Sequence, residues 1–76
     1  MTRFKELVAI ALKTAPETLS DDAAPSTVTS WDSLAHVVMV SLFEDEYGVT
    51  FSAEEIAGIQ SLADFRRILA EKGASL

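Results

Sequence analysis

The stretch "DSLAHVVMVSLFEDEYG", Asp32 to Gly48, decides the fold because it carries one helix with both its start and its stop. The Asp32 carboxylate can accept a hydrogen bond from a free backbone N–H of a first turn. Gly48 suits the residue that closes a helix in the left-handed conformation. The residues between them are mostly apolar, so we expect a helix over residues 33–47.

Three further helices are expected around this one. Apolar residues at helical spacing predict a helix over residues 3–13. "SAEE", residues 52–55, is a capping box in which Ser and Glu each satisfy the other's backbone N–H, and it opens a short helix ending near Gly58. "SLAD", residues 61–64, repeats this device with an aspartate as a weaker partner, and it opens a last helix that stops near Gly73.

A long connection separates the first two helices. Pro16 and then "SDDAAPSTVTS", residues 20–30, break the helical pattern, and we expect a loop that touches the core through Leu19 and Val28. The prediction is a single all-α domain over residues 1–76: a four-helix bundle with three main helices, one short third helix and a long first loop. The residues expected in its core by default are Phe43, Tyr47, Phe51, Phe65 and Ile68.

The charge of the chain is lopsided. Twelve acids and six bases give a net charge of −6, and no Lys or Arg lies between Thr14 and Phe65. A nucleic-acid binder needs a basic surface, so we expect no nucleic-acid partner. An acidic field steers a protein toward basic partner surfaces, although acidity can also serve only to keep a small domain in solution.

Several site classes are excluded by composition. The chain has no cysteine and a single histidine, His36, so neither a disulfide nor a metal centre built on these residues is expected. The apolar run over residues 7–12 is too short to span a bilayer. We therefore expect a cytoplasmic protein with no membrane partner, and a monomer.

A helical wheel divides residues 33–47 into two faces. The broad apolar arc predicted to face the core holds Ala35, Val38, Met39, Val40, Leu42, Phe43 and Tyr47. The remaining face mixes apolar, hydroxyl and acidic side chains: Leu34, Val37, Ser41, Glu44 and Asp45. Apolar anchors with surrounding charge are typical of a docking surface. The alternative is that Leu34 and Val37 pack under the long loop.

Ser33 stands at the start of this helix, beside the mixed face. It is a poor candidate for a catalytic nucleophile, because the only histidine lies one turn further along the same helix. It is a better acceptor for a phosphate-containing group, since free N–H groups at a helix start favour an anion. The alternative is an ordinary helix-start serine with no further role.

The ordered set of these features resembles the phosphopantetheine-binding acyl carrier proteins, in their discrete stand-alone form. The matching stretch is "WDSLAHVVMVSLFEDEYGVTFSAEEIAGIQSLADFRRIL", residues 31–69, and the first helix and loop match in general pattern. It contains the Asp-Ser-Leu attachment motif, an acid-rich helix end, a capped short helix and a last helix beginning "SLADF".

The resemblance implies a carrier rather than an enzyme. A phosphopantetheinyl transferase would attach 4′-phosphopantetheine from coenzyme A to Ser33, and the thiol of this arm would hold an acyl or aminoacyl group as a thioester. Asp32 and Leu34 would flank the attachment point. Partner loading and transfer enzymes, carrying basic docking patches, would recognise the mixed face of Leu34, Val37, Ser41, Glu44 and Asp45.

Two residues beside the motif have open roles. His36 could approach the attached phosphate, or it could be an ordinary boundary residue; Trp31 is expected to anchor the loop to the helix start. Many fatty-acid carriers have a glycine shortly before the Asp of the motif, where this chain has Trp31. Members that are acidic along the whole of this helix carry acids at the positions of Ala35 and Val38. This favours a specialised pathway of polyketide, aminoacyl or surface-polysaccharide type. The alternatives are a housekeeping fatty-acid carrier, or a helical adaptor without a covalent arm.

Overall fold

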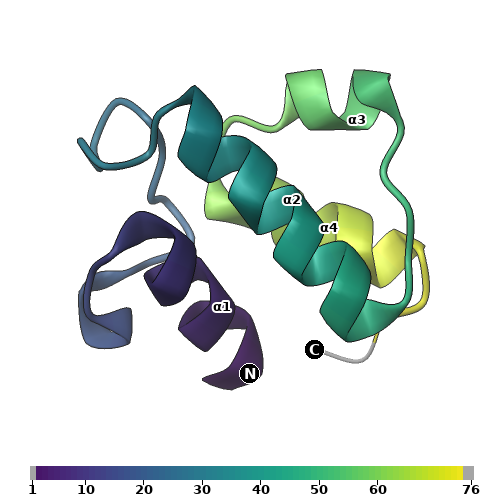
Figure 1. Cartoon of the computed structure of the whole chain (residues 1–76), viewed down its shortest axis with the longest axis horizontal. Coiled ribbons are helices and arrows are strands. Elements are labelled where there is room, and N and C mark those ends of the chain that lie inside the picture. The colour runs from purple at the N-terminus through teal and green to yellow at the C-terminus, as the bar shows by residue number, and fades with distance from the viewer. Residues whose placement is uncertain (1, 75–76) are drawn as a thin grey trace.

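The computed structural model describes residues 2–74, and within them all regular structure is helical. The α-helices are α1 (Thr2–Leu12), α2 (Ser33–Tyr47), α3 (Ala53–Gly58) and α4 (Leu62–Glu71), with a short 3-10 turn, η1 (Pro16–Thr18), after α1. The segment after α2 runs back along that helix and places α3 beside its N-terminal part (Figure 1). The predicted all-α bundle, with a short third helix and a long first loop, is confirmed.

Helix α2 begins and ends where its caps predict. The Asp32 side chain accepts a hydrogen bond of 2.9 Å from the backbone N–H of Ala35. Gly48 adopts the left-handed conformation, with φ of 65°, and its N–H donates to the Glu44 carbonyl at 2.9 Å. Both ends are therefore fixed by contacts within a few residues of the chain.

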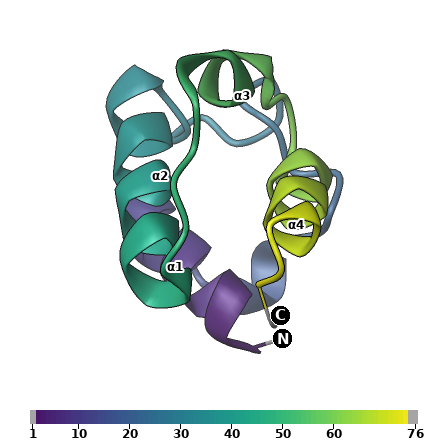
Figure 2. The ribbon, with the colours of Figure 1, turned by 90° about the vertical axis from the view of Figure 1, so that its right-hand side faces the viewer.

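The core is organised around aromatic rings from three helices and two connections. Phe4 of α1 stacks on Phe43 of α2 at 5.1 Å between ring centroids, and Phe65 of α4 meets Phe43 edge-on at 5.0 Å. Phe51 and Trp31 approach the Phe65 ring from the connections, at 5.9 and 6.3 Å. Figure 2 shows the result: α2 and α4 lie on opposite sides, α3 closes one end and α1 lies across the other.

The caps of α3 and α4 differ from each other. The capping box of α3 is confirmed: Glu55 N–H donates to Ser52 Oγ at 3.1 Å, and Ser52 N–H donates to Glu55 Oε1 at 2.8 Å. At α4 the Ser61 hydroxyl caps the helix, but the Asp64 carboxylate accepts from the N–H of Gln60 rather than from that of Ser61. The expected reciprocal bond to the Ser61 N–H is wrong, because the Asp64 carboxylate is engaged by the Gln60 N–H at 2.8 Å instead.

The long connection between α1 and α2 is attached to the core as predicted. Leu19 is buried and Val28 packs against the buried cluster. Its backbone also serves α4: the N–H groups of Leu62 and Ala63 donate to the carbonyls of Ala23 and Asp21, both at 3.0 Å. These donors belong to the first turn of α4, which has no acceptors of its own. The sequence did not predict this contribution.

The core face of α2 follows the wheel with one exception. Ala35, Met39, Val40 and Phe43 are buried, whereas Val38 is 37% exposed. The placement of Val38 in the core was wrong, because this residue lies at the edge of the arc and lines a surface groove between α1 and α2. Among the described residues, no helix combines the length and apolar character that crossing a membrane requires.

Candidate functional site

Ser33 is exposed, and its hydroxyl is not used by the fold. The neighbouring Asp32 supplies the cap of α2, by accepting from the Ala35 N–H. Within residues 2–74 no hydrogen bond of the structure engages the Ser33 side chain. A serine that does not cap its own helix leaves a hydroxyl available for reaction with an external group.

Ser33 lies at an open pocket between the start of α2 and α3, with a volume of about 480 Å³. Its lining is largely apolar and comes from the loop, α2 and the α3 region: Pro25, Trp31, Asp32, Ser33, His36, Val37, Ile56, Ala57 and Ile59. The sequence did not predict that Ile56 and Ile59 would border the site. Their position depends on where α3 folds back, and no local pattern encodes that.

His36 joins three parts of this site through both of its ring nitrogens. The Trp31 indole N–H donates to His36 Nδ1 at 3.0 Å, and His36 Nε2 lies 2.9 Å from the Ile56 carbonyl oxygen. The indole only donates and a carbonyl only accepts, so the ring is the neutral tautomer with its proton on Nε2. Both nitrogens are thus occupied in holding α3 to the start of α2, which favours the alternative of a structural residue, and an approach of His36 to an attached phosphate stays a prediction.

Trp31 forms the inner wall of the pocket. It is 3% exposed, and its ring stacks near those of His36 and Phe65, at 6.0 and 6.3 Å between centroids. Its indole N–H is satisfied by His36. The prediction that Trp31 anchors the loop to the helix start is confirmed.

The apolar part of the proposed docking face is open to solvent. Leu34 is 74% exposed and Val37 is 56% exposed. The alternative, in which the long loop covers these two side chains, is therefore wrong. Ser41 and Asp45 are also exposed and lie further along the same helix. An exposed leucine and valine beside acids keep the composition expected of a docking surface.

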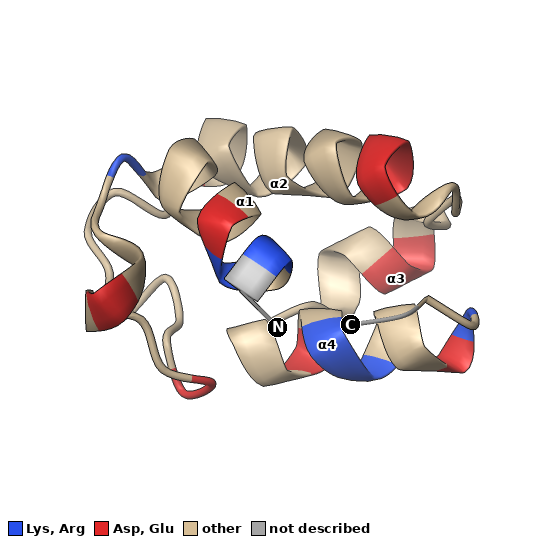
Figure 3. Ribbon diagram, turned by 90° about the horizontal axis from the view of Figure 1, so that it is seen from below, with Lys and Arg blue, Asp and Glu red and all other residues tan. Residues whose placement is uncertain are grey.

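Glu44 differs from the other members of this face. It is half-buried, and its Oε2 accepts a 2.9 Å hydrogen bond from the backbone N–H of Phe51. This contact attaches the end of α2 to the connection that leads to α3. Figure 3 shows acidic segments at this end of α2 and on α3. Within that acidic region Asp45 is exposed, whereas Glu44 has a structural role.

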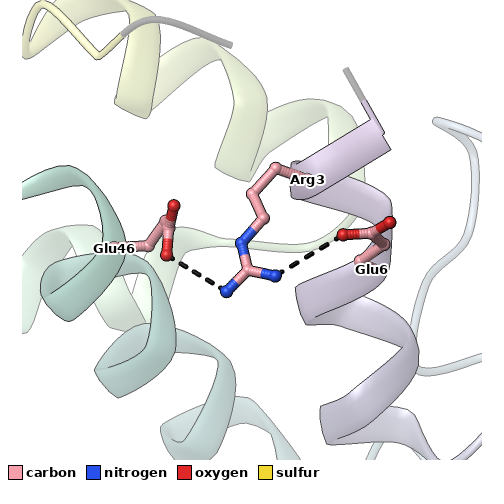
Figure 4. A network of polar contacts seen from close by, with 3 residues as sticks. All are labelled: Arg3, Glu6 and Glu46. Carbon is pink, nitrogen blue, oxygen red and sulfur yellow. Dashed lines mark hydrogen bonds and ion pairs between the residues drawn. The ribbon is translucent and has the colours of Figure 1, made fainter.

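The basic side chains are mostly paired. Arg3 bridges α1 and α2, contacting Glu46 at 3.2 Å and Glu6 at 3.5 Å (Figure 4). Its hydrogen bond to Glu46 raises the pKa of the Arg3 guanidinium. The other contacts join Lys5 to the Leu19 carbonyl, Arg66 to Asp21, Arg67 to Asp64 and Glu71, and Lys72 to Glu55. Lys13 is the one base for which the described residues provide no such partner.

Comparison with known proteins adds no further assignment. No protein-family model matches this sequence, and no curated protein matches it. Within the described residues, no group of three or more His, Asp or Glu side chains is placed to hold a metal ion. Ser33 and the residues around it therefore remain the candidate site.

Proposed function

We propose that this protein is a carrier whose 4′-phosphopantetheine arm is attached to Ser33, and that it presents thioester-bound acyl or aminoacyl groups to partner enzymes. The observation that carries the proposal is the division of labour at the start of α2. Asp32 caps the helix, and the adjacent Ser33 hydroxyl is exposed and unbonded beside an open pocket. The resemblance of residues 31–69 to acyl carrier proteins supports the same site.

The attachment reaction requires an accessible hydroxyl. The Ser33 oxygen forms a new bond to the pantetheine-bearing phosphorus of coenzyme A, and the pyrophosphate P–O bond breaks. Adenosine 3′,5′-bisphosphate leaves, and the hydroxyl proton passes to a base of the transferase. When attached, the arm supplies a terminal thiol that holds the cargo as a thioester, which is compatible with a carrier chain that has no cysteine.

The proposed partners are the phosphopantetheinyl transferase and the loading and transfer enzymes of one pathway. Exposed Leu34 and Val37 supply apolar contact area, and Asp45 supplies negative charge beside them. A basic patch on the partner would complement this arrangement. We place the protein in the cytoplasm as a monomer, in a specialised pathway of polyketide, aminoacyl or surface-polysaccharide type.

Intact-mass measurement tests the attachment site. The purified chain is incubated with coenzyme A and a broad-specificity phosphopantetheinyl transferase. We expect the wild type and Ser26→Ala to gain one phosphopantetheine, and Ser33→Ala to gain none. Ser26 is a suitable control because it is an exposed loop serine.

Two results would contradict the proposal in different ways. A wild type that stays unmodified removes the carrier function and leaves the adaptor without a covalent arm as the better explanation of exposed Leu34 and Val37. A Ser33→Ala variant that is still modified keeps the carrier function but places its arm elsewhere.

A further inference from the structure

A second hollow lies on the opposite side of the Ser33 turn, between the end of α1 and the start of α2. Its volume is about 370 Å³, and it is bordered by both sequence neighbours of Ser33, Asp32 and Leu34. Its remaining lining is Ile10, Ala11, Leu12, Lys13, Ser30, Ala35 and Val38. Ile10 is 61% exposed, Leu34 74% and Val38 37%, so three large apolar side chains border this α1–α2 groove without being covered.

Lys13 occupies an unusual position in this groove. It follows the last residue of α1 with a φ of 56°, a left-handed conformation in which glycine is the ordinary residue. The N–H of Thr14 donates back to the Ala9 carbonyl at 3.1 Å, which is the bond that closes such a helix end. The helix end thus explains the conformation, but it does not explain a lysine.

The positive charge of Lys13 is also unpaired within residues 2–74. The other five bases of the chain contact a carboxylate or a carbonyl, and residues 2–74 offer no such partner to Lys13. The acid of the groove, Asp32, uses its Oδ1 to cap α2. Lys13, whose ammonium has no such partner, therefore lines an apolar groove next to Ser33.

We propose that the α1–α2 groove binds the phosphate-proximal part of the arm attached to Ser33. Lys13 is the counter-cation of the phosphodiester, and Ile10, Leu34 and Val38 contact the methyl-bearing segment that follows the phosphate. This inference rests on the proposed carrier function and extends it by assigning the arm a resting site on the side of α1.

Tethering and charge both favour this occupant. The arm begins one residue from Asp32 and Leu34, so its effective concentration at the groove is of the order of millimolar without any diffusional encounter. A lysine binds phosphate as a point charge and needs no fixed geometry. The pocket on the α3 side has no equivalent cation, since both nitrogens of its His36 are bonded within the fold.

The test compares apo and holo protein by NMR in four chains: wild type, Lys13→Gln, Lys13→Gly and Arg67→Gln. Arg67→Gln is the matched control, because it also removes one positive charge but from an exposed, ion-paired position on α4. In the wild type and Arg67→Gln we expect nuclear Overhauser contacts between the arm's methyl groups and the side chains of Ile10, Leu34 and Val38. In both Lys13 variants we expect the equilibrium constant between the groove-bound and free arm to fall about tenfold, which corresponds to about 1.4 kcal/mol.

Salt provides a second readout. Raising the ionic strength should weaken the arm contacts of the wild type and leave the residual contacts of Lys13→Gln unchanged, because only the former depend on an ion pair. Lys13→Gly removes the steric strain of a lysine in the left-handed backbone conformation, so this variant should not be less stable than the wild type. A loss of arm contacts in that variant therefore does not result from unfolding.

The possible outcomes distinguish a failure of the groove assignment from a failure of the proposed carrier function. If intact mass shows that Ser33 accepts no arm, the carrier function and the groove assignment fail together. If Ser33 is loaded but the arm contacts only Val37 and Ile56, or keeps its groove contacts in Lys13→Gln, the carrier function stands and the groove assignment is overturned.

Discussion

Lys13 holds a left-handed backbone conformation that an L side chain adopts at a cost. Replacing it with glycine removes this steric cost, about 1–2 kcal/mol. Part of this gain is offset, because glycine gives the unfolded chain more conformational entropy. We expect Lys13→Gly to raise the free energy of unfolding by about 0.5–1 kcal/mol and the melting temperature by a few degrees.

Thermal and urea unfolding measure this effect, with Lys13→Ala as the control that removes the charge but keeps the strain. A Lys13→Gly chain less stable than Lys13→Ala would contradict the strain argument. Stabilisation together with loss of the arm contacts would show that Lys13 serves binding rather than folding.

Tyr47 carries a buried hydroxyl without a hydrogen-bond partner in the described part of the chain. Burial, and secondarily the charge of Glu46, raises the pKa of this phenol. Above about pH 10 the unfolded chain loses the Tyr47 proton, whereas the folded state keeps it until the pH reaches its higher folded pKa. Stability contributed by the protonated form is present below that pH and is lost as the pH rises through the folded pKa.

We expect Tyr47→Phe to be neutral or stabilising at pH 7, by up to about 1 kcal/mol, because it removes an unsatisfied polar atom. It should also reduce the loss of stability at alkaline pH. Urea unfolding of both chains between pH 8 and pH 11 tests this; equal alkaline losses would show that Tyr47 is not the titrating group.

At the scale of elements, α3 is attached by polar contacts at both ends and by apolar packing of Ile56 and of Ile59 just beyond it. None of its residues is buried, and its N-terminal end is held by the capping box and by the 2.9 Å ion pair between Glu55 and Lys72. His36 holds its other end through the Ile56 carbonyl. The position of α3 at the Ser33 pocket therefore depends on a few replaceable side chains.

Removing the His36 ring should loosen α3. We expect His36→Leu to cost about 1–3 kcal/mol, because it leaves the buried Trp31 N–H without an acceptor. Trp31→Phe removes that donor, so the double variant should be more stable than the sum of the single changes predicts, by about 1 kcal/mol. Unfolding free energies give this coupling, and additive effects would show that the indole–imidazole bond contributes nothing.

We expect Glu55 to contribute to the acid side of the stability profile. The backbone N–H of Ser52, and then Lys72, lower the pKa of this carboxyl by bonding its charged form. A carboxylate with a lowered folded pKa adds stability above its unfolded pKa, about 4.3, which disappears as the pH falls through the folded value. Glu55→Gln should therefore flatten the loss of stability below pH 5.

Glu54→Gln is the matched control for this change, since Glu54 is the adjacent exposed acid and makes no ion pair within residues 2–74. Amide exchange of α3 as a function of pH is the measurement. If both variants keep the wild-type acid loss, Glu55 is not its source.

Local contacts explain why the helix limits could be predicted. Asp32, Gly48, Ser52 and Glu55 act on backbone groups within a few residues, so their patterns in the sequence are sufficient. The capping of α4 by loop carbonyls, and the His36 contact with Ile56, join positions far apart in the chain. Such contacts follow only from the packed arrangement, and therefore the neighbours of Ser33 were only partly predictable.

At the scale of the whole molecule, the charges are unevenly shared. The bases are largely neutralised by contacts within the fold, whereas exposed acids remain at the end of α2 and on α3 (Figure 3). A partner with a basic surface therefore meets a net negative face. Of the site predicted from the sequence, Ser33, Leu34, Val37, Ser41 and Asp45 are exposed on one helix. Asp32, His36 and Glu44 are the members that the fold itself uses.

Docking should depend on Asp45 in a manner sensitive to salt. We expect Asp45→Lys to slow modification by the transferase several-fold at low ionic strength, and less at high ionic strength, because encounter between charged surfaces is screened. Asp22→Lys, an exposed loop acid with the same change in net charge, is the control. Equal rates for the two variants would indicate that only net charge matters. Glu44 is unsuitable for this test, since its carboxylate holds the Phe51 amide.

The attachment of α3 has a thermal consequence. Detaching α3 exposes Ile56, which packs against the core, but leaves the central aromatic rings covered, so its heat-capacity change is smaller than that of unfolding the core. The free energy of detaching α3 therefore curves less with temperature than that of unfolding the aromatic core. We expect access to the Ser33 pocket and the survival of the fold to follow different courses as the temperature rises.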